Sequence, residues 1–310
     1  MSKSEEKSPV VFIQDALRRN VEKETKGNVT VLYDDTGRPS YMMRIPKFNV
    51  ETVDSSLGRG VHPAFIVDGK EVDEIFIGCK NAQIIDGRAY SIPDESATRN
   101  VTFDAAREAC TKKGKGWHLL SAWEYAALAM WAVKNHPKYF DKDYWEWVDG
   151  MKIVGGKIFI HKDNHFELPE NDWPYMGICF DDVGGKPLLR KEVTHYTEPE
   201  PKGVEDERYG DYTLCELSEM EYFVSPEASP SDFSKQELET LGQLLLIPSA
   251  TPIIAEIDNT VYVRNYGERL PIRGGHWSSG ADAGLGALHL SVRRSYSSSH
   301  VGFRPAFIGI

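Results

Sequence analysis

The chain is poor in cysteine: only four occur in its 310 residues, and no two of them form a CxxC pair. This excludes a zinc ribbon and a thioredoxin-like redox motif, which both need thiols at that spacing. Cys79 and Cys110 lie in apolar or amphipathic runs and are expected to be buried thiols. No run of about 18 apolar residues occurs, so no membrane span is expected. The first eight residues are polar and charged, so we expect a protein made in the cytoplasm without a signal peptide.

Positive charge is also scarce, because 36 Lys and Arg residues stand against 47 Asp and Glu residues. The formal net charge of -11 argues against nucleic acid as a partner, since a basic face is needed to displace counterions. It argues equally against docking on anionic lipid. Hydrophobic residues make up 41% of the chain, which is enough for a sizeable core and too much for a disordered protein.

Hydrophobic periodicity predicts an α+β fold, with two helices packed on antiparallel sheets. One of these two helices is expected at 102–113, where Thr102 can cap its start. The second is expected at 121–135, where Ser121 and Glu124 form a capping box and apolar residues on nearly all faces predict burial. Further helices are expected at 9–24 and 234–246, and strands at 28–33, 40–48, 64–67, 74–77, 89–92, 152–160, 252–263 and 288–292.

The domain organisation follows from composition and turn signals. Acidic and proline-rich stretches mark 161–250 as a long insertion, expected on the surface of the main domain. Asp68-Gly69 is expected to join two strands of a central sheet in a hairpin, and Pro46 to end an edge strand. We therefore expect an amino-terminal segment, 1–38, packed on one main domain, 39–310.

The last 38 residues combine two kinds of sequence. Their ends, 273–277 and 302–307, are rich in glycine, aromatic residues and arginine, which is typical of a tightly built frame. Between these ends lie seven serines together with histidine, aspartate and tyrosine residues, whereas Asn, Lys, Glu, Thr and Cys are absent from the whole stretch. A frame filled with varied polar residues is more typical of a recognition surface than of a packed core.

Apolar and polar residues alternate over 288–293, which predicts a half-buried strand. Its polar side chains, those of His289, Ser291 and Arg293, are expected to face solvent. The frame residues are expected to be structural: Gly274 and Gly275 for close backbone approach, Arg304 for holding a carboxylate or carbonyls, and Trp117, Trp277 and Phe303 for the core.

Taken together, these motifs resemble the variable proteins of diversity-generating retroelements. Those are target-binding proteins of phages, bacteria and archaeal viruses, built on a C-type lectin fold of the formylglycine-generating-enzyme (sulfatase-modifying-factor) type. The most specific match is the closing block, Arg-Gly-Gly-x-Trp through Gly-Phe-Arg-Pro-Ala-Phe, and Gly-Trp-His-Leu-Leu-Ser at 116–121 is the second. The matching segments are 39–48, 62–78, 87–92, 114–132, 146–160 and 265–307, roughly half of the chain.

The resemblance implies a source of diversity in a variable region at about 273–307. A reverse transcriptase copies a template repeat with errors at adenines, and the copy replaces the matching coding segment. One adenine change in an Asn codon gives Ser, His, Asp or Tyr, among others, which fits both the residues present and the missing Asn. The residues expected to contact a ligand are His276, Ser278, Ser279, Asp282, Leu285, Gly286, His289, Ser291, Val292, Arg293, Tyr296, Ser298, Ser299 and His300. Tyr296 and the three histidines are the best anchors, because flat rings bury area at low entropy cost.

Enzymatic and metal-binding alternatives are weaker. The related two-cysteine enzymes carry a cysteine pair shortly after the Gly-Gly-x-aromatic motif, and 278–294 contains no cysteine. The Glu-Pro-Asn and Trp-Asn-Asp motifs of sugar-binding calcium lectins do not occur. His161, Asp163, His165 and Glu167 have spacing that could hold zinc or manganese on a strand, but the spacing is unspecific and a loop is expected there. His118, Glu146 and Asp149 are expected to be hydrogen-bonding groups of the fold, not catalysts.

The sequence therefore predicts a non-enzymatic protein that binds an unknown protein or surface ligand through its variable region. We expect no cofactor, no metal, no nucleic-acid partner and no membrane insertion. Display on a virion or a cell surface fits this function. A formylglycine-generating-type oxidase and a carbohydrate-binding lectin are the alternatives.

Overall fold

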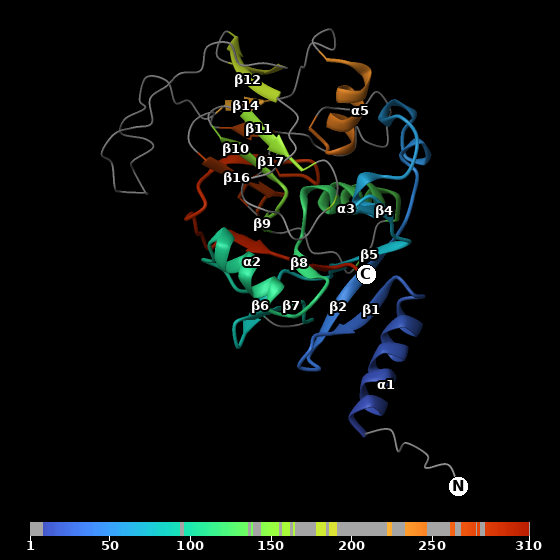
Figure 1. Cartoon of the computed structure of the whole chain (residues 1–310). Helices are drawn as coiled ribbons and strands as arrows, with labels where there is room; N and C mark the ends of the chain where they lie inside the picture. The colour runs from blue at the N-terminus through green and yellow to red at the C-terminus, as the bar shows by residue number, and fades with distance from the viewer. Residues whose placement is uncertain are drawn as a thin grey trace.

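The structure is a computed structural model that describes residues 9–93, 96–135, 138, 144–154, 157–161, 164, 178–183, 186–190, 222–224, 233–246, 261–263, 268–276, 278–279 and 283–309. Helices and mostly antiparallel sheets combine in this part of the chain, which confirms the expected α+β class (Figure 1). No helix in these ranges is long and apolar enough to cross a membrane.

The first sheet combines strands from the amino-terminal and carboxy-terminal parts of the chain. In order, its strands are β1 (Val29–Tyr33), β2 (Pro39–Pro46), β5 (Glu74–Gly78), β19 (Pro305–Phe307) and β8 (Trp117–Leu119). Strand β19 pairs antiparallel with both β5 and β8, so the carboxy-terminal strand lies inside the sheet. Helix α1 (Pro9–Glu24) lies along β1, where Arg18 Nε donates a 3.0 Å hydrogen bond to the Val31 carbonyl (Figure 1).

Strand β2 is an interior strand, so the expected edge position is wrong. It pairs with β1 on one side and with β5 on the other, and Pro46 lies opposite Glu74 where the ladder ends. Proline is tolerated at a strand end because the ladder needs no further donor there. The expected boundary at residue 38 falls between β1 and β2, which are two strands of one hairpin.

The second sheet has ten strands and carries the carboxy-terminal block. Its path runs β13 (Lys186–Arg190), β12 (Ile178–Val183), β11 (Lys157–Ile160), β10 (Met151–Val154), β16 (Glu268–Arg273), β17 (Leu288–Val292), β15 (Val261–Val263) and β14 (Tyr222–Val224), with β9 (Trp145–Trp147) pairing β16 and β18 (Val301–Phe303). The hairpin expected at 152–160 is confirmed as β10 and β11, and the strand expected at 288–292 is confirmed as β17. The sequence does not predict β16, because it includes two arginines that the fold nevertheless buries.

Two short hairpins and three single turns of helix connect the larger elements. Asp68 and Gly69 have φ values of 50° and 71°, as the tight turn between β3 (Ile66–Val67) and β4 (Lys70–Glu71) requires. The expected hairpin turn is confirmed, but only β5 joins the larger sheet, because 66–67 pairs with β4 alone. The remaining short elements are η1 (Val50–Thr52), η2 (Ser55–Leu57), η3 (Pro63–Phe65), β6 (Gln83–Ile85) and β7 (Arg88–Tyr90).

The two central helices form where their caps predict. The Thr102 hydroxyl accepts a hydrogen bond from the Ala105 backbone at the start of α2 (Phe103–Thr111). At the start of α3 (Ala122–Asn135), the Ser121 amide donates to a Glu124 carboxylate oxygen at 2.8 Å, which completes the expected capping box. Every residue of α3 from 122 to 132 is buried, so the helix occupies the core as predicted. Trp117 and Phe303 are buried as expected, whereas Trp277 lies outside the described residues.

The insertion contributes to the core, which corrects the expectation that it lies on the surface. Ser234 caps α5 (Lys235–Gln243) with a complete capping box, as its sequence predicts. Its apolar face and the residues that follow, Leu241 and 244–246, are buried in the same cluster as α3. The side chain of Gln243 also donates a 2.7 Å hydrogen bond to the Leu57 carbonyl.

His62 fixes the carboxyl end of α5 and should make its docking sensitive to acid. This imidazole is fully buried: Nε2 lies 3.1 Å from the Gln243 carbonyl, and Nδ1 accepts from the Ala64 amide, so the ring must be neutral with its proton on Nε2. Burial lowers the pKa of His62 to about 4 from 6.5.

Replacing His62 by glutamine should therefore remove an acid-sensitive step in stability. A folded-state pKa below the unfolded value gives stability that is complete above pH 6.5 and is lost as the pH falls through about 4. Each pKa unit corresponds to about 1.4 kcal/mol, so we expect the native protein to lose about 3 kcal/mol relative to His62→Gln between pH 7 and pH 4. Urea unfolding of both proteins at several pH values measures this difference, and parallel curves would contradict it.

Candidate functional site

The closing frame is anchored by a buried ion pair. Arg304 Nε lies 2.7 and 2.8 Å from the two carboxylate oxygens of Glu146, and Arg304 Nη1 donates a 2.8 Å hydrogen bond to the Gly78 carbonyl. Arg304 is 0% and Glu146 is 2% exposed. The structure thus confirms that Arg304 holds both a carboxylate and a carbonyl, and it ties the closing frame to β9 and β5.

The opening frame is held by a second buried arginine. Arg273 Nη1 donates to the Gly286 carbonyl at 2.9 Å, and Nη2 donates to the Leu244 carbonyl at 2.6 Å. A Cβ on Gly275 would lie 2.5 Å from the Cβ of Ala283, so the close approach expected at this glycine is present. One guanidinium therefore links the 273–286 segment to the carboxyl end of α5.

Two segments near the ends of the 273–307 stretch meet at a pair of histidines. The rings of His276 and His300 stack with centroids 4.3 Å apart and an interplanar angle of 19°. The Ser278 hydroxyl lies 2.9 Å from His276 Nδ1, and the Ser279 amide donates to the His276 carbonyl. Segments 24 residues apart in sequence are thereby brought onto one face.

Strand β17 confirms part of the expected alternation and corrects the rest. Leu288 and Leu290 are buried, while His289 is half-buried with its ring 5.5 Å from that of Trp145. Ser291, however, is only 6% exposed, so its expected solvent-facing position is wrong. Two further expected contact residues, Gly286 and Val292, are buried as well.

A bulge explains why the alternation fails at Ser291. In the pairing of β16 with β17, Leu270 lies opposite Val292 but Ile272 lies opposite His289. Two steps along β16 therefore match three steps along β17, which breaks the strict alternation of faces. Ser291 turns inward, and its hydroxyl lies 3.1 Å from Nδ1 of the neighbouring His289 ring.

The remaining expected contact residues reach the surface to different degrees. Tyr296 is 39% exposed, and its ring lies edge-on to the buried Trp147 at 6.4 Å. Ser278 and Ser299 are also exposed. The half-buried set consists of His276, Ser279, Leu285, His289, Arg293, Ser298 and His300, and Asp282 lies outside the described residues.

Imidazole rings and hydroxyl groups supply most of the hydrogen-bonding groups on this face. Burial, with a smaller contribution from the charge of His300, lowers the pKa of His276. The His276 imidazole thus favours its uncharged form, in which the ring offers one donor and one acceptor. With the hydroxyls of the serines and Tyr296, the face presents adaptable polar groups and little apolar area.

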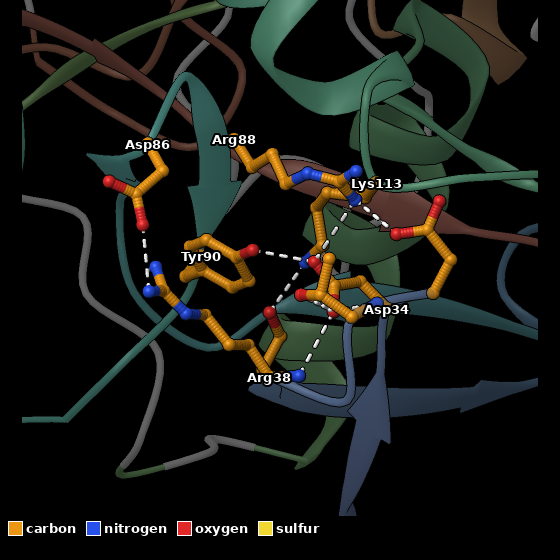
Figure 2. Close-up of polar contacts among 9 residues, drawn as sticks. Asp34, Arg38, Asp86, Arg88, Tyr90 and Lys113 are labelled. Atoms are coloured by element: carbon orange, nitrogen blue, oxygen red, sulfur yellow. Dashed lines mark hydrogen bonds and ion pairs between the residues drawn. The ribbon is translucent and has the colours of Figure 1, made fainter.

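Sequence reasoning missed a second polar cluster, around Lys113 (Figure 2). Lys113 Nζ donates a 2.5 Å hydrogen bond to the Ser40 hydroxyl and lies 3.4 Å from the ring centroid of Trp117. Next to it, the Tyr90 hydroxyl donates to Asp34 at 2.5 Å. Burial lowers the pKa of Lys113 to about 7. The contact with Ser40 spans 73 residues, and no local sequence signal marks it.

The chemistry of this cluster resembles that of a serine nucleophile with a lysine base. A neutral lysine amine at hydrogen-bond distance can accept a proton from a serine hydroxyl. Here, however, Ser40 and Lys113 are both 0% exposed, and Tyr90 and Trp117 cover them at 1% and 4% exposure. A substrate cannot reach the hydroxyl in this arrangement, so the cluster holds β2, β7 and β8 to the end of α2.

No protein-family model matches the chain, and no curated protein does. Any assignment of function therefore depends on the geometry of these sites and on the motifs that the sequence carries.

The thiols and the candidate metal ligands are further candidates for reactive groups. Cys79 and Cys110 are buried as expected, and burial raises the pKa of Cys79 to about 12 and that of Cys110 further, which makes both inert. Of the four residues weighed as metal ligands, His161 is buried, and its carbonyl accepts from Trp123. Asp163, His165 and Glu167 lie outside the described residues, within which no group of three metal-ligating side chains occurs.

Proposed function

We propose that the chain is a non-enzymatic ligand-binding protein of the kind diversified by retroelements, with a C-type lectin fold of the formylglycine-generating-enzyme type. Its ligand would be a protein or surface group, recognised by side chains of the variable region. The observation that carries the proposal is the contact of His276 with His300, which gathers the two ends of the variable region onto one face.

The separation of frame from face supports the same proposal. The residues that flank the variable positions, among them Arg273, Gly275, Phe303 and Arg304, are buried and hold the backbone through close contacts. Most of the described polar residues between them reach solvent. A site can change its side chains without loss of fold only if those side chains do not pack in the core.

Cys79 and Cys110, the two cysteines whose side chains the structure describes, make the oxidase alternative weaker. A thiol-based oxidase needs a reactive thiolate at the surface that meets its substrate, and low exposure with a raised pKa prevents this at Cys79 and Cys110. Neither residue lies in the variable region.

Substitution at the exposed positions should leave the fold intact. We expect single changes at Ser278, Tyr296 or Ser299 to alter the free energy of unfolding by no more than about 0.5 kcal/mol. In contrast, Gly275→Ala should cost at least about 2 kcal/mol, because its φ is +135° and the new Cβ would overlap Ala283. Thermal and urea unfolding of purified variants measures both.

Gly60→Ala is the matched control, since Gly60 has a φ of +108° but open space around its missing Cβ. It reports backbone strain alone, so the additional loss in Gly275→Ala reports the overlap. If the exposed substitutions unfolded the protein as readily as Gly275→Ala, the proposed division into frame and face would be wrong.

A further inference from the structure

Arg294 lies inside the 273–307 stretch, yet its side chain is engaged by other parts of the fold. Its Nε and Nη2 atoms donate hydrogen bonds of 2.9 and 2.8 Å to the two carboxylate oxygens of Glu268 on β16. Its Nη1 atom donates a 2.8 Å hydrogen bond to Asp104, in the first turn of α2. Each of the three guanidinium nitrogens thus has a carboxylate partner, so this side chain is committed to the fold and not offered to a ligand.

An aromatic pair connects Arg294 with Tyr296. The Arg294 guanidinium lies over the ring of Phe103, 5.4 Å from its centroid. The ring of Phe103 packs edge-on against Trp147 at 5.7 Å, and Trp147 lies edge-on to Tyr296 at 6.4 Å. Phe103 and Trp147 are 2% and 0% exposed, so Arg294 and Tyr296 both lie against one buried aromatic pair.

The backbone of the loop that follows β17, residues 293–300, is held at two further points. The Asn100 amide donates to the Ser298 carbonyl at 3.1 Å, and the Trp145 amide donates to the His300 carbonyl at 3.1 Å. Any residue can supply such a carbonyl, so these contacts allow the side chains at both positions to change. The bridge between two carboxylates, in contrast, needs a guanidinium, because only arginine carries three donor nitrogens in one plane.

Tyr296 is the part of this loop best suited to bury area against a ligand. It is the only exposed large apolar side chain among those that the structure describes, at 39%. Its amide donates to the Arg293 carbonyl at 3.0 Å, which closes a turn around Arg294. A ring on a loop binds more tightly when the loop is already ordered, since less conformational entropy is lost on binding.

We propose that Arg294 is a positioning residue of the ligand-binding face: by bridging Glu268 and Asp104 it fixes the start of the loop 293–300 and presents Tyr296 in one orientation. The inference rests on the proposed function, since it takes this loop to be part of the binding face. It adds a constant residue inside the variable stretch, at a position where the side chain is 28% exposed and where exposure alone would not mark it as fixed.

Fluorine NMR of the protein labelled with 3-fluorotyrosine tests this role in the absence of any ligand. Among the signals of the 14 tyrosines, the one that disappears in Tyr296→Phe belongs to Tyr296. Arg294→Gln should move this signal towards that of free 3-fluorotyrosine. It should also make exchange of the Tyr296 amide with solvent about fivefold faster, the factor for a loss of about 1 kcal/mol in partly exposed ion pairs.

Two further variants separate positioning from a general loss of structure. Arg294→Lys should restore part of the order around Tyr296, since lysine keeps the charge but cannot bridge both carboxylates in one plane. Asp104→Asn removes only one of the two partners, so it should change the Tyr296 signal in the same direction as Arg294→Gln and by less.

Arg44→Gln is the matched control. Arg44 is paired with Glu74 at 2.7 Å and lies 5.9 Å from the ring centroid of Phe76, so its surroundings are similar, but it belongs to the first sheet. It should leave the Tyr296 signal and amide exchange as they are in the native protein. The same signal and exchange rate in Arg294→Gln as in the native protein would overturn the proposal, as would an equal change in all the fluorotyrosine signals.

This test fails or succeeds separately from the proposed function. A Tyr296 signal that depends on Arg294 supports the positioning role even if the genome holds no template copy, which would count against diversification alone. If a template copy exists, the codon for Arg294 should be the same in both copies, whereas a template copy combined with an unchanged Tyr296 signal would leave the proposed function and overturn the positioning role.

Discussion

Replacing Glu146 by glutamine should lower the free energy of unfolding by about 3–5 kcal/mol, the usual loss when a buried charge is left without its partner. Arg304 is fully buried, and its Nε is in contact with both oxygens of Glu146. Glutamine has nearly the same shape, so the substitution removes charge with little change in volume. The substitution would weaken the ion pair that joins the closing frame to β9.

Glu268→Gln is a matched control for this loss. Glu268 makes a similar two-point contact with Arg294, at 2.9 and 2.8 Å, but the two side chains are 33% and 28% exposed. Water can replace much of this interaction, so we expect a loss of about 1 kcal/mol or less. Urea unfolding at pH 7 compares the two variants directly. Equal losses would show that burial does not govern the Glu146 contact.

Lys113→Met should make the protein more stable at pH 6, which is an unusual result for a polar residue with a hydrogen bond. Burial lowers the pKa of Lys113 to about 7 from 10.5, so the folded protein disfavours the charged amine. At about 1.4 kcal/mol per pKa unit, the charged form costs roughly 5 kcal/mol below pH 7. Loss of the contacts with Ser40 and Trp117 offsets part of the gain, and we expect a net increase of about 2–4 kcal/mol.

The sign of this effect fixes its pH dependence. A folded-state pKa below the unfolded value means that stability is complete above pH 10.5 and is lost as the pH falls through about 7. The advantage of Lys113→Met should therefore shrink as the pH rises from 7 to 10.5. Buried groups such as Cys79 and Tyr90 also titrate in alkali, but they are common to both proteins, so the difference between the two isolates Lys113.

Lys112→Met is the control for the loss of one positive charge. Lys112 is adjacent in sequence, half exposed, and paired with Glu108 one helical turn away. Removing it should change stability by no more than about 0.5 kcal/mol at any of these pH values. If Lys113→Met were the less stable protein at pH 6, the ammonium would be stabilising the fold, and the depressed pKa would be wrong.

Local signals predicted the elements that depend on neighbouring residues. Thr102, Ser121 and Ser234 cap helices where their sequences place them, because a cap needs only a side chain and an amide two or three residues away. The same holds for the turn at Asp68-Gly69. These features need no knowledge of the rest of the fold.

Local sequence patterns could not predict the contacts between segments that lie far apart in the chain. Ser291 turns inward because of a bulge opposite Leu270 and Ile272, which the sequence of β17 alone does not encode. The leucines that end α5 predicted an apolar face but not the core that covers it.

The central claim is that the variable face is rewritten from a template, and the genome that encodes the chain tests it most directly. Sequencing around the gene should reveal a near-copy of the segment that encodes residues 273–307, close to a reverse-transcriptase gene. We expect the two copies to differ mainly where the template has adenine, at codons for exposed or half-buried residues such as His276, Tyr296 and His300. Codons for Arg273, Gly275 and Arg304 should be the same in both. The absence of both a second copy and a reverse transcriptase would contradict the proposed function.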